Sequence, residues 1–198
     1  MIPKDLVLED DRVRLEPLDF IHAQDLHEAG SDDEIWRMSY RANAMRSVAG
    51  TCRYIGSAVY GIENAGVPFA IVDTQTGKAI GSTRYFDISA PDRKLEIGWS
   101  WLARRYWRTH VNTTCKLLLL TYAFETARAL RVQFKADSEN SRSRAAIERI
   151  GGTFEGTLRN FRVGDDSVRS VSFYSILDTE WPQVKRNLRA AQCEFQRP

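Results

Sequence analysis

Residues 95–112 read LEIGWSWL and then ARRYWRTHVN, a strand-like run followed by a basic segment. An apolar-rich stretch from about Val111 to Leu130 comes next and predicts a long helix. A strand that feeds a loop at a helix start directs unpaired backbone N–H groups and the positive end of the helix dipole toward that loop. The pattern therefore predicts an anion site, suited to a pyrophosphate, to which Arg104, Arg105 and Arg108 add positive charge.

The elements around this stretch follow the order β, helices, β-β-β, α, β, α, β-β. Strands are expected at residues 12–18, 67–73, 78–88, 95–102, 131–137, 154–163 and 167–177. Helices are expected in two short segments before residue 47, then at residues 47–63, 111–130 and 140–150, and in part of 180–193. This order predicts an α+β domain over residues 8–178, built on one mixed, mostly antiparallel sheet flanked by helices, with a partly helical C-terminal tail at residues 179–198.

Two helix details are also expected. Ser31 and Glu34 fit a capping box at the start of the second short helix. On the long helix, one apolar stripe is expected to hold Leu117, Leu120, Phe124 and Ala127. Because other apolar residues flank that stripe, the helix is expected to have further apolar surface available for a homodimer.

Composition excludes several classes of protein. The 28 basic and 26 acidic residues nearly cancel, which argues against a general nucleic-acid-binding surface. The longest apolar run, Leu117–Leu120, is far too short for a membrane span, and the N-terminus has no secretory pattern, so a cytoplasmic protein is expected. Three cysteines and three histidines show no metal-ligand spacing, and no metal is expected.

Glu96 stands inside the strand-like run. Simple alternation places Glu96, Gly98 and Ser100 on one face, and Leu95, Ile97, Trp99 and Trp101 on the other. A carboxylate buried among aromatic side chains has a raised pKa and can take a proton from an ammonium group, directly or through water. The alternative is structural: Glu96 pairs with an arginine of a neighbouring strand, such as Arg84.

A second motif follows the strand expected at residues 131–137. Residues 140–151 read NSRSRAAIERIG and predict a helix that starts at Asn140 and ends at a glycine. The side chain of Asn140 is first of all an N-cap, which accepts a hydrogen bond from the next turn.

Together, these motifs resemble the GNAT superfamily of N-acetyltransferases, specifically its RimJ/RimL-like branch, and the resemblance covers roughly residues 8–181. It implies that the strands at 95–102 and 131–137 splay apart and that acetyl-CoA lies between them. It also implies Glu96 as the base, Ser143 as the acid that protonates the leaving thiolate, with Tyr174 or Tyr106 as alternatives, and Trp36 and Tyr40 as acceptor contacts. The residues expected to contact acetyl-CoA are Trp101, Leu102, Arg105, Arg108, Thr109, His110, Val111, Asn112, Asn140 and Arg144.

The basic loop departs from the family pattern. That pattern is Arg/Gln-x-x-Gly-x-Gly/Ala, and here Arg108 and His110 occupy the two small-residue positions. Glycine lets backbone approach a phosphate closely. With Arg108 and His110 in its place, the loop amides can still point at the ligand if the dihedrals stay at negative φ, and Arg108 can supply charge in compensation.

The expected activity is acetyl transfer from acetyl-CoA to a primary amine, either a protein N-terminus or a small molecule, without a covalent enzyme intermediate. A catalytically silent acyl-CoA-binding module is the alternative, suggested by the altered loop. An RNA-associated protein is a third reading, which draws only on the arginine clusters.

Overall fold

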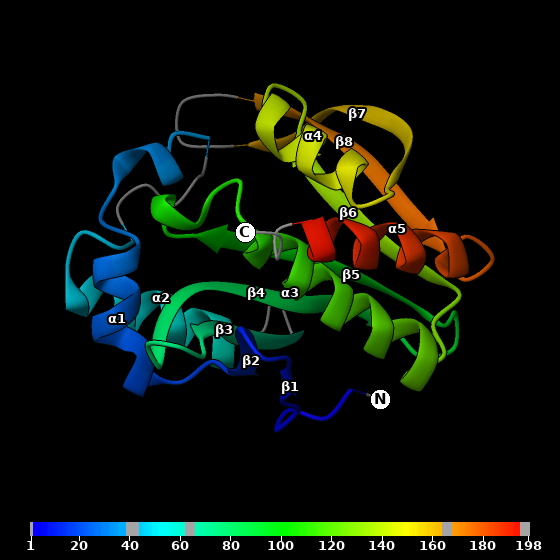
Figure 1. Cartoon of the computed structure of the whole chain (residues 1–198). Coiled ribbons are helices and arrows are strands. Elements are labelled where there is room, and N and C mark those ends of the chain that lie inside the picture. Colours follow the sequence, from blue (N-terminus) through cyan, green and yellow to red (C-terminus); the bar gives the residue numbers. More distant parts are fainter. Residues whose placement is uncertain (1, 39–43, 62–65, 164–167, 195–198) are drawn as a thin grey trace.

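A single eight-stranded sheet organises the computed structural model, which describes residues 2–38, 44–61, 66–163 and 168–194 (Figure 1). The strand order is β1-β2-β3-β4-β5-β6-β8-β7. Only β5 and β6 pair in parallel, and the other neighbours are antiparallel. The strands are β1 (Leu8–Glu9), β2 (Val13–Pro17), β3 (Gly66–Asp73), β4 (Lys78–Ser89), β5 (Lys94–Leu102), β6 (Arg131–Asp137), β7 (Thr153–Val163) and β8 (Val168–Leu177). The predicted α+β fold and the antiparallel meander β3-β4-β5 are confirmed.

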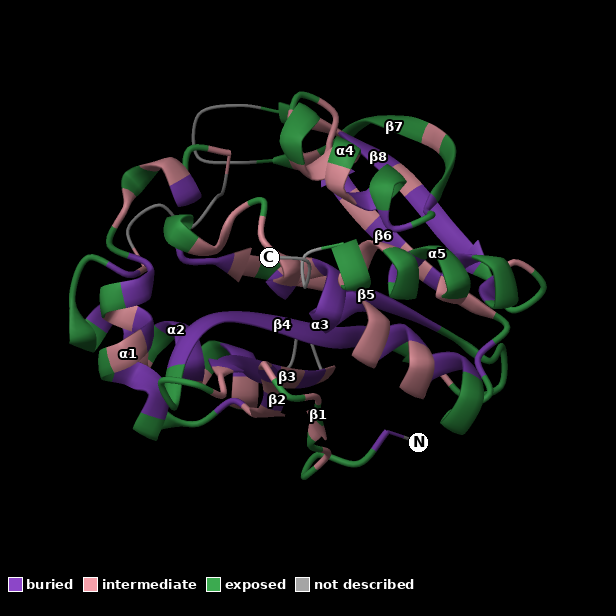
Figure 2. Ribbon diagram, viewed as in Figure 1, coloured by how far each residue is buried: buried purple, intermediate pink, exposed green. Residues whose placement is uncertain are grey.

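Helices cover both faces of the sheet, because the strands alternate between two cores. On β3, Phe69 and Ile71 belong to the core shared with α3 and α5, whereas Ala70 and Val72 belong to the core shared with α1 and α2. The helices are α1 (Ala23–Ala29), α2 (Val48–Tyr60), α3 (His110–Thr121), α4 (Ser141–Arg149) and α5 (Trp181–Glu194). Short 3-10 helices span Phe20–His22, Asp33–Ile35 and Arg104–Tyr106, and a π-helical turn spans Tyr122–Thr126. Figure 2 shows the central strand β4 buried along most of its length and the edge strand β7 exposed.

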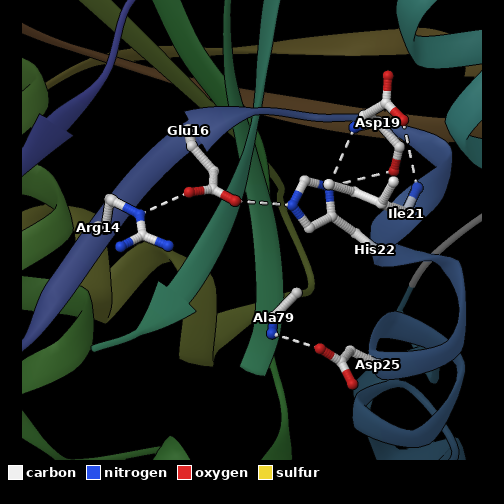
Figure 3. A network of polar contacts seen from close by, with 7 residues as sticks. All are labelled: Arg14, Glu16, Asp19, Ile21, His22, Asp25 and Ala79. Carbon is white, nitrogen blue, oxygen red and sulfur yellow. Dashed lines mark hydrogen bonds and ion pairs between the residues drawn. The ribbon is translucent and has the colours of Figure 1, made fainter. Parts of the chain in front are cut away.

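Polar contacts fix the N-terminal helices to the sheet (Figure 3). His22 Nε2 lies 2.9 Å from Glu16 Oε1 on β2, and Asp25 Oδ2 accepts a hydrogen bond of 3.1 Å from the backbone N–H of Ala79 on β4. The contacts tie the start of α1 to two strands. They hold the chain that continues to Trp36 over one face of the sheet.

The capping box predicted for Ser31 and Glu34 is wrong. The N-cap of this short helix is Asp32, whose side chain accepts a 2.9 Å hydrogen bond from the Glu34 N–H. The Ser31 hydroxyl instead donates to the Glu28 carbonyl at the end of α1. Asp32 can take the N-cap position because a carboxylate is at least as good an N-cap as a hydroxyl.

The long helix ends earlier than predicted. Regular α-helix stops at Thr121, a π-helical turn follows, and Arg128 adopts a left-handed φ of 57°. This reversal lets Leu130 N–H donate to the Arg93 carbonyl and leads the chain into β6. Ala127 is consequently exposed and does not extend the predicted stripe.

The second apolar face of α3 is covered from within the chain. Leu119 and Leu120 are buried, Leu117 and Leu118 are half-buried, and Val184 and Leu188 of α5 belong to the same core. The residues predicted as a tail thus complete the core. The homodimer stays a prediction and receives no support from α3.

Candidate active site

The parallel strands β5 and β6 separate part of the way along their length. They pair only from Lys94/Arg131 to Glu96/Gln133, yet β5 continues to Leu102 and β6 to Asp137. A cleft of about 1240 Å³ opens beyond the last pair and is lined by β5, the 104–108 loop, α3, β6 and α4. The predicted splay of these two strands is therefore present in the structure.

Seven of the predicted site residues line this cleft. They are Trp36, Trp101, Leu102, Arg108, Asn112, Asn140 and Ser143. Six others do not line it, namely Glu96, Arg105, Thr109, His110, Val111 and Arg144. Tyr40 lies outside the described residues.

Glu96 occupies the point where the strands part. Its side chain is 2% exposed, and its Oε2 lies 2.6 Å from Lys135 Nζ and 2.9 Å from Gln133 Nε2. Burial raises the pKa of Glu96 above its ordinary value, although the contacts to Lys135 and Gln133 oppose that rise. The ion pair that the structural alternative predicted exists, but the partner is Lys135 of β6 instead of Arg84 of β4.

A β-bulge breaks the alternation of β5 just after Gly98. Arg84 pairs with Gly98 while Ser82 pairs with Trp101, so β5 contains an extra residue, and Trp99 has a φ of 54°. The predicted faces of Ser100 and Trp101 are therefore wrong. Ser100 Oγ accepts a 2.7 Å hydrogen bond from Lys116 of α3, while Trp101 Nε1 donates to Tyr54 of α2, on the opposite side of the sheet.

The start of α3 is the helix start that the sequence predicted as an anion site. Thr109 is the N-cap, and its hydroxyl bonds both the Tyr106 carbonyl and, at 3.4 Å, the Val111 N–H. Arg108, where the family pattern has glycine, adopts a left-handed φ of 60°. The condition of negative φ is therefore not met at Arg108, where the backbone keeps the glycine-like shape with an arginine side chain.

The start of α4 confirms the N-cap at Asn140. Its Oδ1 accepts a 3.0 Å hydrogen bond from the Ser143 N–H, and both residues line the cleft. Thus the Ser143 hydroxyl is carried on a helical turn that the Asn140 side chain fixes.

Two arginines of α4 take different directions. Arg144 Nε donates to Tyr174 Oη at 3.0 Å and its Nη1 donates to the Ser138 carbonyl at 3.2 Å. The guanidinium carbon of Arg142 instead lies 3.8 Å from the ring centre of Trp107, across the cleft. Arg142 is therefore the arginine of α4 that bridges to the basic loop.

The two tyrosines considered as alternative acids are both engaged. Tyr174 is fully buried and donates to Glu148 at 3.2 Å. Tyr106 lines the cleft but donates to Asp73 at 2.7 Å, and burial together with that carboxylate raises the pKa of Tyr106. Both hydroxyls therefore donate to carboxylates within the fold.

Two lysines in the cleft wall were missed in the sequence. Lys135 contacts Glu96, as described above, and Lys116 is 6% exposed among apolar residues of α3. Burial lowers the pKa of Lys116 to about 8. A lysine inside the apolar run CKLLLL is a signal that could have identified Lys116.

The remaining chemistry of the cleft is limited. Cys115 lines it, but burial raises the pKa of this thiol to about 12, which disfavours a thiolate nucleophile. Within the described ranges, no group of three or more His, Cys, Asp or Glu side chains could hold a metal ion.

None of the helices in those ranges has the length and apolar character needed to cross a membrane.

Comparisons with known proteins agree with this geometry. A family model described as "Acetyltransferase (GNAT) domain" matches residues 12–153. A Bacillus subtilis (strain 168) protein named "Putative ribosomal N-acetyltransferase YdaF" is 33% identical over 109 residues, which are 55% of this chain and 59% of YdaF. The chain thus spans about three fifths of the length of that relative.

Two solved structures extend the comparison over the whole fold. A GCN5-related N-acetyltransferase from Brucella melitensis superimposes with a TM-score of 0.89 at 27% identity, covering 96% of this chain and 86% of the other. RimJ of Mycobacterium smegmatis, solved in complex with CoA-disulfide, gives a TM-score of 0.79 at 20% identity, covering 96% and 97%. At that identity, the likeness to RimJ shows the fold alone.

Proposed function

The chain belongs to the GNAT acetyltransferase family, and on that premise we propose that it transfers the acetyl group of acetyl-CoA to a primary amine. The observation that carries the proposal is the cleft where β5 and β6 part. It is lined by Arg108 and Asn112 at the start of α3 and by Lys135, the ion-pair partner of the buried Glu96, whose pKa is raised by burial. The length of the cleft along β5 suits an extended ligand whose phosphate end and reacting end lie apart.

The phosphate end of acetyl-CoA is assigned to the start of α3. The first turn of a helix presents free N–H groups and a positive dipole end, and Arg108 and Arg104 line the same part of the cleft. Asn112 and Asn140 then flank the pantetheine arm. Arg142, which lies across the cleft from Trp107, adds a further cation at this end.

The reaction proceeds by direct attack of the neutral amine on the thioester carbonyl. Glu96 accepts the proton of the incoming ammonium through a water molecule, because its side chain is nearly inaccessible. Charge on the tetrahedral intermediate is stabilised by a backbone N–H of β5 near Trp101. The thiolate of CoA leaves and takes a proton from Ser143 Oγ. The nitrogen of the intermediate loses its second proton to solvent, and solvent returns a proton to Ser143. Glu96 then releases its proton, so the products are the amide, the CoA thiol and one proton.

Trp36 is assigned to the acceptor end. Its ring centre lies 5.1 Å from that of Trp101, and it lines the cleft together with Tyr54 of α2. Arg104 of the basic loop bonds to Asp32, just before Trp36, so the Trp36 segment lies beside the loop assigned to the phosphates.

A silent acyl-CoA-binding module is the second candidate. The observations that favour it are the ion pair that holds Glu96 and the arginine in the place of the loop glycine. Both functions include binding of acetyl-CoA, and only the first includes release of CoA in the presence of an amine.

One experiment separates the two. The purified protein is incubated with acetyl-CoA and a panel of amines, comprising free amino acids, polyamines and short peptides, while thiol release is followed and products are identified by mass. Acceptor-dependent thiol release supports the transferase. Tight binding of acetyl-CoA in calorimetry without release for any amine would show the silent module instead.

A further inference from the structure

Arg84 is a buried cation with two unpaired guanidinium nitrogens. Its side chain is 1% exposed, and within the described part of the chain neither Nε nor Nη2 has a hydrogen-bond partner. The guanidinium carbon lies 4.9 Å from the centre of the Trp99 ring. Burial of a charge without hydrogen bonds is unfavourable in free energy, so an anion that binds this group would stabilise it.

The identity of the two unpaired nitrogens indicates which anion. The Nε–H and one N–H of Nη2 point in the same direction, along one edge of the planar guanidinium group. That edge binds the two oxygens of a carboxylate in parallel, an arrangement that a lysine cannot provide. Arg84 therefore presents the edge that suits a carboxylate.

Arg84 lies on the same sheet face as Glu96. Tyr85, its neighbour on β4, turns to the other face, where its hydroxyl donates to the Leu119 carbonyl of α3. Phe86 pairs directly with Glu96, and Arg84 is two residues along β4 from Phe86. Glu96 and Arg84 are thus diagonal neighbours on adjacent strands, a relationship that spans roughly 7–8 Å between backbone positions.

The wall of the cleft separates Arg84 from the ligand space. Gly98, which pairs with Arg84, and Trp99, whose ring stacks on it, both line the cleft. Trp99 is held at a left-handed φ of 54°, a backbone state that costs roughly 1–3 kcal/mol for a residue with a side chain and is typical of ligand sites. Access from the cleft to the Arg84 edge therefore requires the Trp99 side chain to move aside.

We propose that Arg84 binds a carboxylate of the amine acceptor, so that the acceptors of this protein are small molecules bearing both a primary amine and a carboxylate, such as free amino acids. The proposal rests on the proposed function, since it assigns the acceptor of that same reaction. With the amine directed to Glu96, a carboxylate a few bonds away reaches Arg84. A protein N-terminus carries an amide at that position and leaves the arginine without its partner.

The test compares matched acceptors. Free amino acids, their carboxamides and their decarboxylated amines are assayed with acetyl-CoA by thiol release, and kcat/KM is compared within each set. We expect kcat/KM for the carboxylate form to exceed that for the carboxamide by roughly 10- to 100-fold, as for hydrogen bonds to a charged group. A ratio near one in the wild-type protein would overturn the proposal and leave the Arg84 edge to bound water.

Two variants refine this test. Arg84→Lys keeps the charge but cannot form two parallel hydrogen bonds to a carboxylate. Because roughly one hydrogen bond of the pair is lost, the carboxylate-to-carboxamide ratio of kcat/KM should fall at least several-fold. Both rates come from one preparation, so partial misfolding cancels in the ratio. Arg53→Lys, at an exposed position on α2, is the matched control and should keep the wild-type ratio. An unchanged ratio in Arg84→Lys would contradict the assignment.

Failure of the transferase function is distinguishable from failure of this subsite. If no amine is acetylated, the proposed reaction is wrong, and the subsite is then tested by titrating the CoA-bound protein with N-acetyl amino acids and with their amides. Stronger binding of the carboxylates, lost in Arg84→Lys, supports the subsite. Equal binding, or no binding of either, overturns it.

Discussion

Lys135 places its ammonium nitrogen 2.6 Å from the carboxylate of Glu96, and of these two residues only Lys135 lines the cleft. Two opposing effects act on the pKa of Glu96. Burial raises the pKa of Glu96, while the neighbouring cation and Gln133 lower it, and the balance remains above the ordinary value. Lys135 therefore sets how basic Glu96 is and at which pH it can accept a proton.

Removal of that cation should move the pH profile of the reaction. Lys135→Met takes away an influence that lowers the pKa of Glu96, so the carboxylate should stay protonated to higher pH. The acid limb of kcat/KM against pH should then shift upward, with reduced activity below it and recovery above it. Lys135→Arg, which keeps a cation, should retain a limb close to that of the wild type. A limb that moves downward in Lys135→Met, or does not move, would contradict this role.

Charge reversal at Arg108 should weaken the binding of acetyl-CoA. Arg108 lines the cleft beside the start of α3, and a glutamate there would repel the pyrophosphate. In calorimetry, Arg108→Glu should raise the Kd roughly 10-fold or more at low salt and by less at high salt, because salt screens exposed charges. Arg53→Glu on α2 should leave the Kd unchanged. An unchanged Kd in Arg108→Glu would remove Arg108 from the donor site.

Lys116 should make the folded protein more stable as the pH rises. Burial lowers its pKa from 10.5 to about 8 in the folded state. Between these values the unfolded chain binds more protons than the folded one, so the free energy of unfolding rises with pH across this window. Over the whole window, the free energy of unfolding rises by roughly 3 kcal/mol, at about 1.4 kcal/mol for each unit of pKa.

Urea unfolding at pH 7 and at pH 9.5 checks this contribution. Lys116→Met carries no charge, so it should be more stable than the wild type at pH 7 and should lack the rise between the two pH values. Lys4→Met, at an exposed site near the N-terminus, should keep the rise. If Lys116→Met is less stable than the wild type at pH 7, contacts of the buried cation outweigh its desolvation. If the variant still shows the full rise, the rise comes from other groups.

Ser143→Ala should impair the departure of CoA. If Ser143 protonates the thiolate, kcat should fall by roughly 10²-fold or more, the effect of losing a positioned acid, and the defect should persist at high pH. The defect in kcat should be smaller with an acetyl donor whose thiol has a lower pKa than that of CoA, because such a thiolate leaves without a proton. A wild-type kcat in Ser143→Ala would exclude this residue as the acid.

Much of the fold could be predicted from the sequence, because hydrophobic periodicity and helix-start residues act locally. The range 131–137 coincides with β6, and Asn140 is the N-cap of α4 as expected. The faces of β5 could not be predicted beyond Gly98, since a bulge depends on the register with β4 and shifts every later side chain to the opposite face. The end of α3 was missed for a related reason: a π-helical turn and a left-handed Arg128 are set by how the chain enters β6.

The site residues also divide into those that local motifs predict and those that depend on packing. Residues that belong to contiguous motifs, such as Asn140, Ser143 and Arg108, were found and do line the cleft. The ion pair between Glu96 and Lys135 joins two residues that are far apart in the sequence. It depends on the parallel register of β5 and β6, which no local pattern specifies. Arg84 was considered only as a partner for Glu96, and its unpaired nitrogens became apparent only in the packed structure.

The central claim is that Glu96 removes the proton of the acceptor amine, and Glu96→Gln tests it most directly. Glutamine keeps the shape and can still bond to Gln133 and Lys135, but it cannot take up the proton. With an acceptor identified by thiol release, kcat should fall roughly 10²- to 10⁴-fold while the Kd for acetyl-CoA stays near that of the wild type. Raising the pH should partly restore the rate, because more of the amine then arrives already neutral. A wild-type kcat in Glu96→Gln across the whole pH range would contradict the account.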